Sequence, residues 1–569
     1  MVFDRLEALA DRIVDAMGES RMVALLVVAL AALVLLIPGQ AELPLTERDE
    51  ARYVIASKQM LESGDFIEPM NLDQPRWKKP VGIYWLQAGA AMITGQGAEA
   101  PLWVYRLPSL LGILGAALLT VWAMRPILSS RAAAIAGLVV GTSIVTVLEG
   151  NIAKTDAALL FTIVLAQGAL IRCLTADTDR FTGMHALFWA ATAAGVLIKG
   201  PVILMVSGGM IALLIVIERG WRALRAIRPA LGLPLFALLT APWFIAIGIE
   251  TDWGFYVESV QNDLLGKVGG AAEGHTGPIG YYSATMWATF WPWMPLLLCA
   301  IPFLWTRRRS EAVIYLVAWA LPFWITFELL TTKLPHYVMP ILPGIGGMIG
   351  MWLTSNEHDL ARPGPFIRLP AALLSLVGGG ALAALLIAGP IEIEGQILLP
   401  AAILGGLGLA LTLLAAAALF AGRAGAYGVL SLGAMALLIP GLVSVTLPRL
   451  EALSPSPTLA ALHMKYDACA DLPVVATGYD ELSIAFHAGT DMRRTDLAGA
   501  ADWLTTGPEG ARAIVELRDP AAEGQLAAAA GVPLEKIEEI TAINYNDNGD
   551  PMPIALFARA GDPAIAACR

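Results

Sequence analysis

A charged and aromatic segment, 45–87, interrupts a chain that is otherwise mostly apolar. It contains Asp49-Glu50-Ala51-Arg52-Tyr53 and, further along, Lys78-Lys79-Pro80. On a helix, Asp49, Arg52 and Tyr53 would share one face, because residues three and four apart are neighbours. A carboxylate, a guanidinium and a phenol in one stripe can bind a polar substrate, and lysine binds phosphate as a compact point charge. The segment therefore predicts a binding surface for an anionic ligand.

Each of these residues also has a purely structural interpretation. Thr46-x-x-Asp49 matches a helix start, in which Asp49 would only cap the backbone. Lys78 and Lys79 could anchor the chain to lipid headgroups, since long basic side chains extend to the membrane surface. The sequence leaves both interpretations open.

Further polar and ionisable residues lie at the ends of apolar segments: Asn151, Lys154, Asp156, Lys199, His275, Lys333, His336 and Tyr337. Charges in or beside a bilayer are costly and usually functional. Asp156 lies just inside an apolar segment and is the most costly of these charges to keep without a partner. Its structural interpretation is a charge at the start of a helix at the membrane interface. For His275 the alternative is strong, because a lone loop histidine is more often structural than a ligand.

The sequence lacks the patterns of several common reaction classes. It contains no His/Cys/carboxylate cluster with convincing metal spacing, no phosphate-binding or dinucleotide-binding glycine loop, and no Gly-x-Ser-x-Gly elbow. Cytoplasmic ATP or NAD chemistry therefore finds no support. The net charge of −11 argues against nucleic acid as a partner.

Composition predicts that a membrane positions these residues. Hydrophobic residues make up 57% of the chain and charged residues 15%, against about 25% charged in soluble domains. Runs of roughly 17–25 apolar residues suffice to span a bilayer as a helix. No cleavable signal pattern precedes the first such run. Thirteen segments are candidate spans: 22–40, 103–125, 132–149, 153–172, 184–198, 201–217, 229–249, 283–304, 311–330, 336–354, 368–389, 396–421 and 425–447.

Charge predicts the orientation of these spans, since cytoplasmic loops are enriched in Lys and Arg. With the N-terminus inside, the cytoplasmic loops hold Arg125, Arg131, Arg172, Arg180, Arg219, Arg222, Arg225, Arg228, Arg307, Arg308, Arg309, Arg362, Arg368 and Arg423. The opposite loops at 250–282 and 390–395 are mainly acidic. The polar residues near span ends then fall mostly on the external side, which predicts a shared cavity. Segment 41–102 is external yet basic, and this exception again indicates an anionic ligand.

Residues 450–569 contain no spanning run. Short apolar runs (473–477, 484–488, 513–517 and 554–558) alternate with helical stretches such as 525–531, which predicts a small external α/β domain. The expected organisation is a membrane domain at 1–449, with external loops at 41–102, 250–282 and 328–337, followed by this domain. Cys469 and Cys568 are its only cysteines, and an external compartment permits a disulfide between them. Cys173 and Cys299 lie at or within spans and are expected to be buried thiols.

The motifs, taken in order, resemble polyprenyl-phosphate-sugar transferases of the GT-C class, specifically the aminoarabinose lipid A transferases and bacterial protein-mannosyltransferase-like proteins. The matching positions are Asp49, Glu50, Arg52 and Tyr53, then Met60–Asp65, Lys79-Pro80, Tyr84-Trp85, Asp156, His275, Pro278, Tyr281, Tyr282, Lys333, Leu334, Pro335, Tyr337 and Pro340. Each motif is weak alone, but the ordered set over 40–350 is specific. Many relatives have Glu-Lys-Pro where this chain has Lys78-Lys79-Pro80, so a cation replaces an acid that could help to bind a metal.

This resemblance implies a helical polytopic membrane protein that performs an inverting sugar transfer at the external face of the bacterial inner membrane. The donor would be a sugar on polyprenyl (undecaprenyl) phosphate, and the acceptor lipid A or another envelope lipid. Asp49 would activate or orient the acceptor, with Asp156 assisting. Cations would stabilise the leaving phosphate, and the candidates are Lys79, Lys333, Tyr337 (as a hydrogen-bond donor), Lys78 and Arg52. The further substrate-contacting candidates are Glu50, Tyr53, Tyr84, His275 and His336. The resemblance identifies no certain cofactor, and a divalent metal stays open.

Two other functions remain compatible with the sequence. Protein O-glycosylation uses the same donor class, and the sequence does not separate its acceptor from a lipid. A lipid or solute transporter would account for the many spans, but transporters tend to show two related halves with sites at mid-bilayer. Here no internal repeat is visible, and the charges lie at one face.

Overall fold

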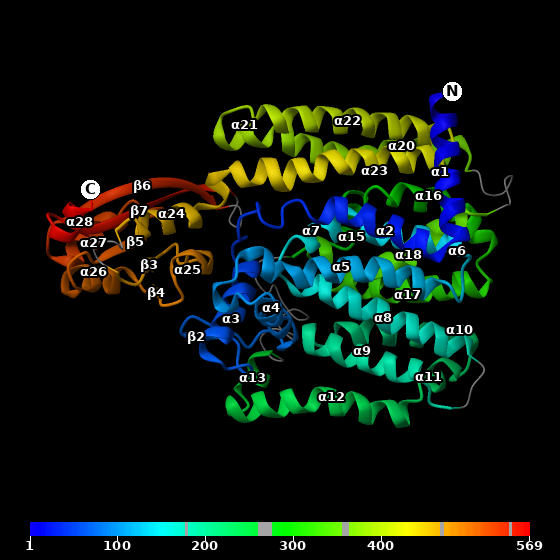
Figure 1. The fold of residues 1–569 in the computed structure, drawn as a ribbon, viewed down its shortest axis with the longest axis horizontal. Coiled ribbons are helices and arrows are strands. Elements are labelled where there is room, and N and C mark those ends of the chain that lie inside the picture. The colour runs from blue at the N-terminus through cyan, green and yellow to red at the C-terminus, as the bar shows by residue number, and fades with distance from the viewer. Residues whose placement is uncertain (177–179, 260–275, 356–362, 467–470, 545–548, 569) are drawn as a thin grey trace.

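The computed structural model describes residues 1–176, 180–259, 276–355, 363–466, 471–544 and 549–568. A long helical bundle carries a small sheet-containing unit at one end (Figure 1). The N-terminus lies at the opposite end of the bundle, where the first helix, α1 (Val2–Glu19), runs across the ends of the other helices. The predicted class, a helical membrane protein with a small C-terminal α/β unit, is confirmed.

Within the described ranges, seven helical segments are long and apolar enough to cross a membrane. They are α5 (Leu102–Met124), α8 (Thr155–Thr175), α12 (Pro229–Glu250), α17 (Glu311–Leu329), α20 with α21 (Pro365–Glu394), α22 (Leu399–Phe420) and α23 with its continuation (Ala424–Arg449). The number is nine if each of two bent helix pairs is counted as one span: α6 (Ser130–Gly141) with α7 (Ile144–Gly150), and α15 (Tyr281–Thr289) with α16 (Met294–Thr306).

Shorter helices occupy the remaining predicted spans. They are α2 (Arg21–Leu36), α9 (Gly183–Lys199), α10 (Val202–Glu218) and the 3-10 helix η4 (Pro335–Ile341) leading into α18 (Leu342–Leu353). Every one of the thirteen predicted segments therefore coincides with helix, whereas the number of membrane crossings stays a prediction.

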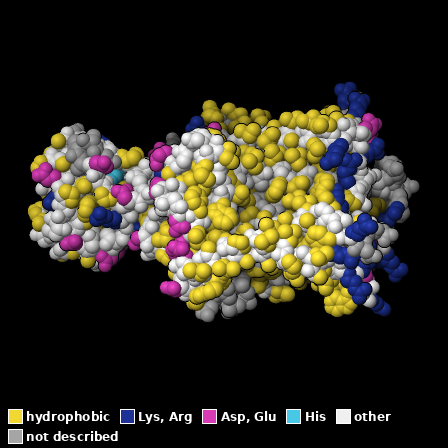
Figure 2. Space-filling view, turned by 60° about the horizontal axis from the view of Figure 1, so that its bottom comes forward, with side chains coloured by type: hydrophobic (Ala, Val, Ile, Leu, Met, Phe, Trp, Pro, Cys, Tyr) yellow, Lys and Arg dark blue, Asp and Glu magenta, His cyan; other side chains and the backbone are white. Residues whose placement is uncertain are grey.

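The two ends of the bundle differ in charge. Figure 2 shows Lys and Arg side chains gathered at the end that carries α1, and Asp and Glu side chains toward the end that carries the C-terminal unit. Ion pairs tie α1 to this basic end, from Asp15 to Arg131 (3.0 Å) and from Asp4 to Arg423. The charge asymmetry inferred from the loops is thus a feature of the folded bundle.

The charged segment near the start of the chain forms a layer between the bundle and the C-terminal unit (Figure 1). It contains α3 (Asp49–Ser63), a hairpin of β1 (Met70–Asn71) and β2 (Gln74–Pro75), and α4 (Gly82–Ile93). The N-cap of α3 is Arg48, so Thr46 does not cap this helix as the alternative interpretation of Asp49 required. Asp49 is instead the first helical residue.

The C-terminal unit is built on a five-stranded sheet in the order β4-β3-β5-β7-β6. The strands are β3 (Val475–Thr477), β4 (Arg493–Arg494), β5 (Arg512–Glu516), β6 (Leu534–Asn544) and β7 (Asp550–Arg559). The sheet is mixed, because β3 pairs parallel to β4 and β5, whereas β7 pairs antiparallel to β5 and β6. Its helices are α24 (Pro455–Met464), α25 (Leu482–Ala488), α26 (Leu497–Thr506), α27 (Ala522–Ala530) and α28 (Pro563–Ala567).

The described cysteines fall into the two predicted groups, buried thiols and a disulfide-bonded cysteine. Cys173 and Cys299 are buried free thiols, and Cys568 is disulfide-bonded. Cys469 lies outside the described residues, so its pairing with Cys568 stays a prediction.

Candidate functional site

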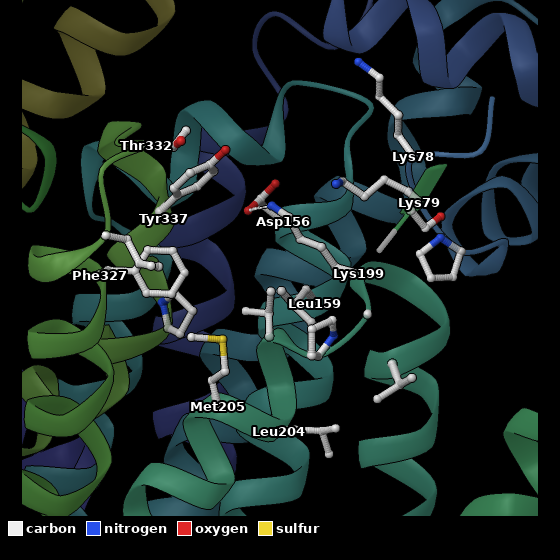
Figure 3. Close-up of a pocket in the computed structure, with 18 of the residues that line it drawn as sticks. Lys78, Lys79, Asp156, Leu159, Lys199, Leu204, Met205, Phe327, Thr332 and Tyr337 are labelled. Atoms are coloured by element: carbon white, nitrogen blue, oxygen red, sulfur yellow. Dashed lines mark hydrogen bonds and ion pairs between the residues drawn. The ribbon is translucent and has the colours of Figure 1, made fainter. Parts of the chain in front are cut away.

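A cavity of about 420 Å³ opens beneath the loop that precedes α4 (Figure 3). Its walls come from α8, α9, α10, α12, α13 (Gly254–Tyr256), α17 and η4, which are far apart in the sequence. The lining is polar at one end and apolar along the rest. The apolar lining includes Leu159, Val196, Val202, Leu204, Met205, Phe244, Phe255 and Phe327. A long hydrocarbon chain fits such a surface, because burial of apolar area is favourable without directional contacts.

The polar end contains four of the predicted site residues. Lys78, Lys79, Asp156 and Tyr337 all line the cavity. Lys79 points toward the carboxylate of Asp156, whereas Lys78 extends away from it (Figure 3). Lys199 is the last residue of α9. Its ammonium donates a hydrogen bond of 2.6 Å to Asp156 and lies 5.3 Å from the Tyr337 ring centroid. This end of the cavity therefore presents several cations and a phenol around one carboxylate.

A row of ionisable side chains continues from Asp156. Lys154 contacts Glu149 at 3.2 Å, and His336 lies between Glu149 (3.5 Å) and Asp156 (3.9 Å). All five of these side chains are at most 14% exposed: Glu149, Lys154, Asp156, Lys199 and His336. Buried charges are retained in proteins mainly where they are paired, and here Lys154 pairs with Glu149 and Lys199 pairs with Asp156. The sequence analysis missed Glu149. An acidic residue at the end of an apolar span was the signal that could have identified it.

Asp49 lies at the start of α3 with its side chain 56% exposed, and its carboxylate is 3.9 Å from the guanidinium of Arg52. Partial burial of its own carboxylate would raise the pKa of Asp49, but the charges of Lys154, Arg76 and Arg52 outweigh that effect. The pKa of Asp49 therefore lies below its ordinary value, and the group stays ionised at neutral pH. An ionised, accessible carboxylate can accept hydrogen bonds from a sugar or an acceptor hydroxyl.

Tyr53 and Tyr84 hold Arg76 in place. The hydroxyl of Tyr84 accepts a hydrogen bond of 3.0 Å from Arg76, and the guanidinium lies 4.6 Å from the Tyr53 ring centroid. All three side chains are buried. The two tyrosines predicted to contact substrate thus sit beneath the surface, where they fix a cation that acts electrostatically on Asp49.

Glu50 lies in a fully buried ion pair with Arg106 from α5, at 2.8 Å. Arg106 also donates to the carbonyls of Leu43 (2.7 Å) and Pro44 (3.0 Å), and Glu50 accepts the backbone N–H of Ala153 (2.8 Å). This pair ties the start of α3 to the entry of α8. Glu50 was predicted to contact substrate, but it is 0% exposed. Arg106 was missed, although an arginine within an apolar span was a usable signal.

One further predicted residue, Lys333, is not among those that line the described cavity. Lys333 is 4% exposed and donates to the carbonyls of Glu328 (2.7 Å) and Phe327 (3.2 Å). His275 lies outside the described residues. In the part of the chain that the structure describes, no group of three or more His, Cys, Asp or Glu side chains is arranged to hold a metal ion.

This architecture is that of a helical multi-pass membrane protein, and solved structures of other proteins share its fold. A crystal structure of ArnT from Cupriavidus metallidurans bound to undecaprenyl phosphate matches it with a TM-score of 0.71, covering 93% of this chain and 97% of that one at 18% identity. The oligosaccharyltransferase of Archaeoglobus fulgidus matches with a TM-score of 0.51 at 12% identity, covering 91% of this chain and 69% of that one. At such low identities, these matches demonstrate a shared fold.

Sequence comparison points to the same relatives. Residues 78–245 match the family described as dolichyl-phosphate-mannose-protein mannosyltransferase. The chain is 28% identical over 358 residues to the undecaprenyl phosphate-alpha-4-amino-4-deoxy-L-arabinose arabinosyl transferase of Edwardsiella ictaluri, covering 62% of each chain. It is also 28% identical to the enzyme of the same name from Erwinia tasmaniensis, covering 63% of this chain and 64% of that one. The match thus spans under two thirds of these relatives. The resemblance predicted from the ordered motifs is confirmed.

Proposed function

We propose that this protein transfers a sugar from a polyprenyl-phosphate donor, of the undecaprenyl type, to lipid A or another lipid of the bacterial envelope. The observation that carries the proposal is the cavity, in which a long apolar lining ends at Lys79, Lys199 and Tyr337. A polyprenyl phosphate likewise consists of a long apolar chain that ends in an anionic group. The names of the relatives that match this chain support the same donor class.

In the proposed complex, the polyprenyl tail lies along the apolar lining and the phosphate lies at the cationic end. Lys79 and Lys199 provide charge, and Tyr337 can donate a hydrogen bond. Lys78 and Arg52 contribute to the positive potential around the site. Lys333 supports the site from behind, since its ammonium holds the segment that leads into η4.

The proposed reaction is an inverting displacement. An acceptor oxygen attacks the anomeric carbon on the side opposite the phosphate, and the bond between that carbon and the donor phosphate oxygen breaks. The leaving lipid phosphate gains negative charge, which fixed cations stabilise more in the transition state than in the ground state. Lys79 is our principal candidate for this role.

Asp49 is proposed to orient the acceptor or the sugar rather than to remove a strongly held proton. Its depressed pKa makes it a weak base, and general bases work best when their pKa lies near the working pH. A phosphate acceptor on lipid A would already be ionised and would need little base catalysis. Asp156, held by Lys199 and beside His336, would assist in placing the reacting groups.

We further propose that the N-terminus is cytoplasmic and that the C-terminal domain, 450–569, is periplasmic in the inner membrane. The gathering of Lys and Arg at the end of the bundle that carries α1 supports this orientation (Figure 2), because cytoplasmic ends are enriched in these residues.

The test is mass spectrometry of lipid A and of total envelope lipids from cells that lack this protein, complemented with wild type, Asp49→Asn or Asp73→Asn. Asp73 is an exposed acid in the same external segment and serves as the matched control. We expect a sugar-sized mass to disappear in the deletion and to return with wild type and Asp73→Asn only. Normal transfer by purified Asp49→Asn would refute the role of Asp49.

Protein O-glycosylation is the second candidate, favoured by the match of 78–245 to a protein mannosyltransferase family. An unchanged lipid profile together with lost glycoprotein masses in the deletion strain would support it. Unchanged lipids and unchanged glycoproteins would count against both transferase proposals and favour transport.

A further inference from the structure

The start of α3, which carries Asp49, is held from outside by the C-terminal domain. The backbone N–H of Arg48 donates a hydrogen bond of 3.3 Å to the carboxylate of Glu481, and the Arg48 side chain lies 3.9 Å from the same group. One residue earlier, the carboxylate of Glu47 accepts a hydrogen bond from the hydroxyl of Tyr479. Two consecutive residues immediately before Asp49 are therefore fixed by a domain more than 400 positions away in the sequence.

Arg48 has a backbone conformation that needs such support. Its φ is 60° and its ψ is −96°, a region that residues with a side chain rarely occupy. Conformations of this kind persist only where the surrounding structure holds them, and they concentrate at functional sites. Because Asp49 is the next residue, the dihedral angles of Arg48 set the direction in which the first turn of α3 leaves the loop.

The group that holds Arg48 and Glu47 is itself rigid. The Tyr479 hydroxyl hydrogen-bonds to Ser456 (2.8 Å), and Ser456 hydrogen-bonds to Ser483 (2.7 Å). Ser456 and Ser483 come from α24 and α25, and both are buried with Tyr479. The hydroxyl that contacts Glu47 thus has its position fixed by two helices of the C-terminal domain.

Apolar packing joins the same two units. One hydrophobic cluster includes Val54 and Ile55 of α3 together with Leu482 and Ala485 of α25. On its other side, α3 is anchored to the bundle through the buried carboxylate of Glu50. The first turn of α3 is therefore held between a fixed inner anchor and the C-terminal domain.

We propose that Glu481 and Tyr479 are positioning residues for the transfer reaction, which fix the Glu47–Arg48 turn and thereby aim Asp49 and Arg52 at the donor site. The inference rests on the proposed function of that site. Without these contacts, Arg48 would relax to an ordinary dihedral region, and the carboxylate of Asp49 would swing with the first turn. The C-terminal domain would then be part of the catalytic apparatus rather than an appendage.

The test compares Glu481→Gln and Tyr479→Phe with Thr490→Ala in the purified full-length protein. Thr490 is the matched control, because its hydroxyl donates to Glu62 (2.6 Å) across the same interface but at the far end of α3. We expect kcat to fall about ten-fold or more in the two positioning variants, with the donor KM changed less than two-fold. Amide hydrogen exchange over 46–52 should rise about ten-fold in these variants only.

A rescue variant separates backbone positioning from a loss of folding. Glycine adopts positive φ readily, so Arg48→Gly in the Glu481→Gln background should recover kcat without restoring the lost contact. A double variant slower than Glu481→Gln alone would contradict the proposed strain. A fall in Tm that parallels the loss of kcat would assign the effect to folding and would overturn the inference.

The two proposals fail in distinguishable ways. If wild type transfers no sugar to lipid or protein acceptors, the proposed function fails. The hydrogen exchange then decides the structural part of the inference: unchanged exchange over 46–52 in Glu481→Gln and Tyr479→Phe would refute the positioning contact. If wild type turns over and Glu481→Gln and Tyr479→Phe match Thr490→Ala in kcat, the positioning role is refuted while the transferase proposal stands.

Discussion

Replacing Lys199 by methionine should destabilise the protein in a way that a second substitution largely reverses. Lys199 and Asp156 lie 2.6 Å apart, with side chains 14% and 9% exposed. At an effective dielectric of about 20, such charges attract by roughly 6 kcal/mol. Most of that attraction is offset by desolvation, so the intact pair is nearly neutral for stability, but removing one partner of a buried pair costs about 3–5 kcal/mol. We expect about 3 kcal/mol, the lower end of that range, because neither side chain is completely buried.

The assay is a double-mutant cycle of equilibrium unfolding in mixed micelles titrated with SDS. Adding Asp156→Asn to Lys199→Met should restore most of the lost free energy of unfolding, giving a coupling of about 2–3 kcal/mol, within the range for residues in contact. Sugar transfer should remain low in the double variant, because the cation at the phosphate end is still missing. Additive destabilisation would refute the coupling, and transfer that recovers with stability would refute a role for Lys199 at the phosphate.

Three further predictions concern other parts of the site. Lys79→Ala should lower kcat/KM for the donor about 10²–10³-fold, as for loss of one stabilising group at a developing charge. Lys78 points away from Asp156 (Figure 3), so Lys78→Ala should lower kcat/KM less than ten-fold. Equal losses in the two variants would contradict this assignment. Arg106→Met should cost about 3–5 kcal/mol in the same micelle unfolding assay, because it leaves Glu50 charged and buried, and wild-type stability would show that the pair does not anchor α3. Burial raises the pKa of Glu47 from 4.5 to about 7, so the buried state of this side chain at the C-terminal domain is most stable below pH 4.5 and loses stability as pH rises through about 7. Hydrogen exchange at 46–48, corrected for intrinsic rates, should therefore increase between pH 5 and pH 8, and Glu47→Gln should reduce that increase without removing it, because burial also raises the pKa of Glu481.

Several features of this protein follow from local sequence alone. Composition and apolar runs predict the helical membrane bundle, because each span must satisfy its backbone within itself. The spacing of Asp49 and Arg52 predicts a shared helical face, and α3 begins at Asp49. The order of motifs between 40 and 350 predicts the resemblance that the comparisons confirm. The basic and acidic ends of the bundle also follow from the alternation of loops along the chain.

The interior of the site could not be predicted in the same way. Tyr53, Tyr84 and Glu50 carry the right residue types for substrate contact, but the fold buries them as supports for Arg76 and for the start of α3. Exposure depends on which neighbours cover a side chain, and this information is absent from a local pattern. The expected role of Lys333 meets the same difficulty, since its ammonium is held at the end of α17 by two carbonyls and by the carboxylate of Glu328.

The class of protein, the helices and the set of residues available for chemistry can all be inferred from short stretches of the chain. Which of these residues meet depends on the folded arrangement: Lys199 pairs with Asp156 across 43 positions, Glu50 with Arg106 across 56, and Arg48 with Glu481 across 433. Helix formation and membrane insertion are governed by neighbouring residues, so they leave a local signature. Ion pairing in a buried site depends on how helices pack, and partners that far apart leave none.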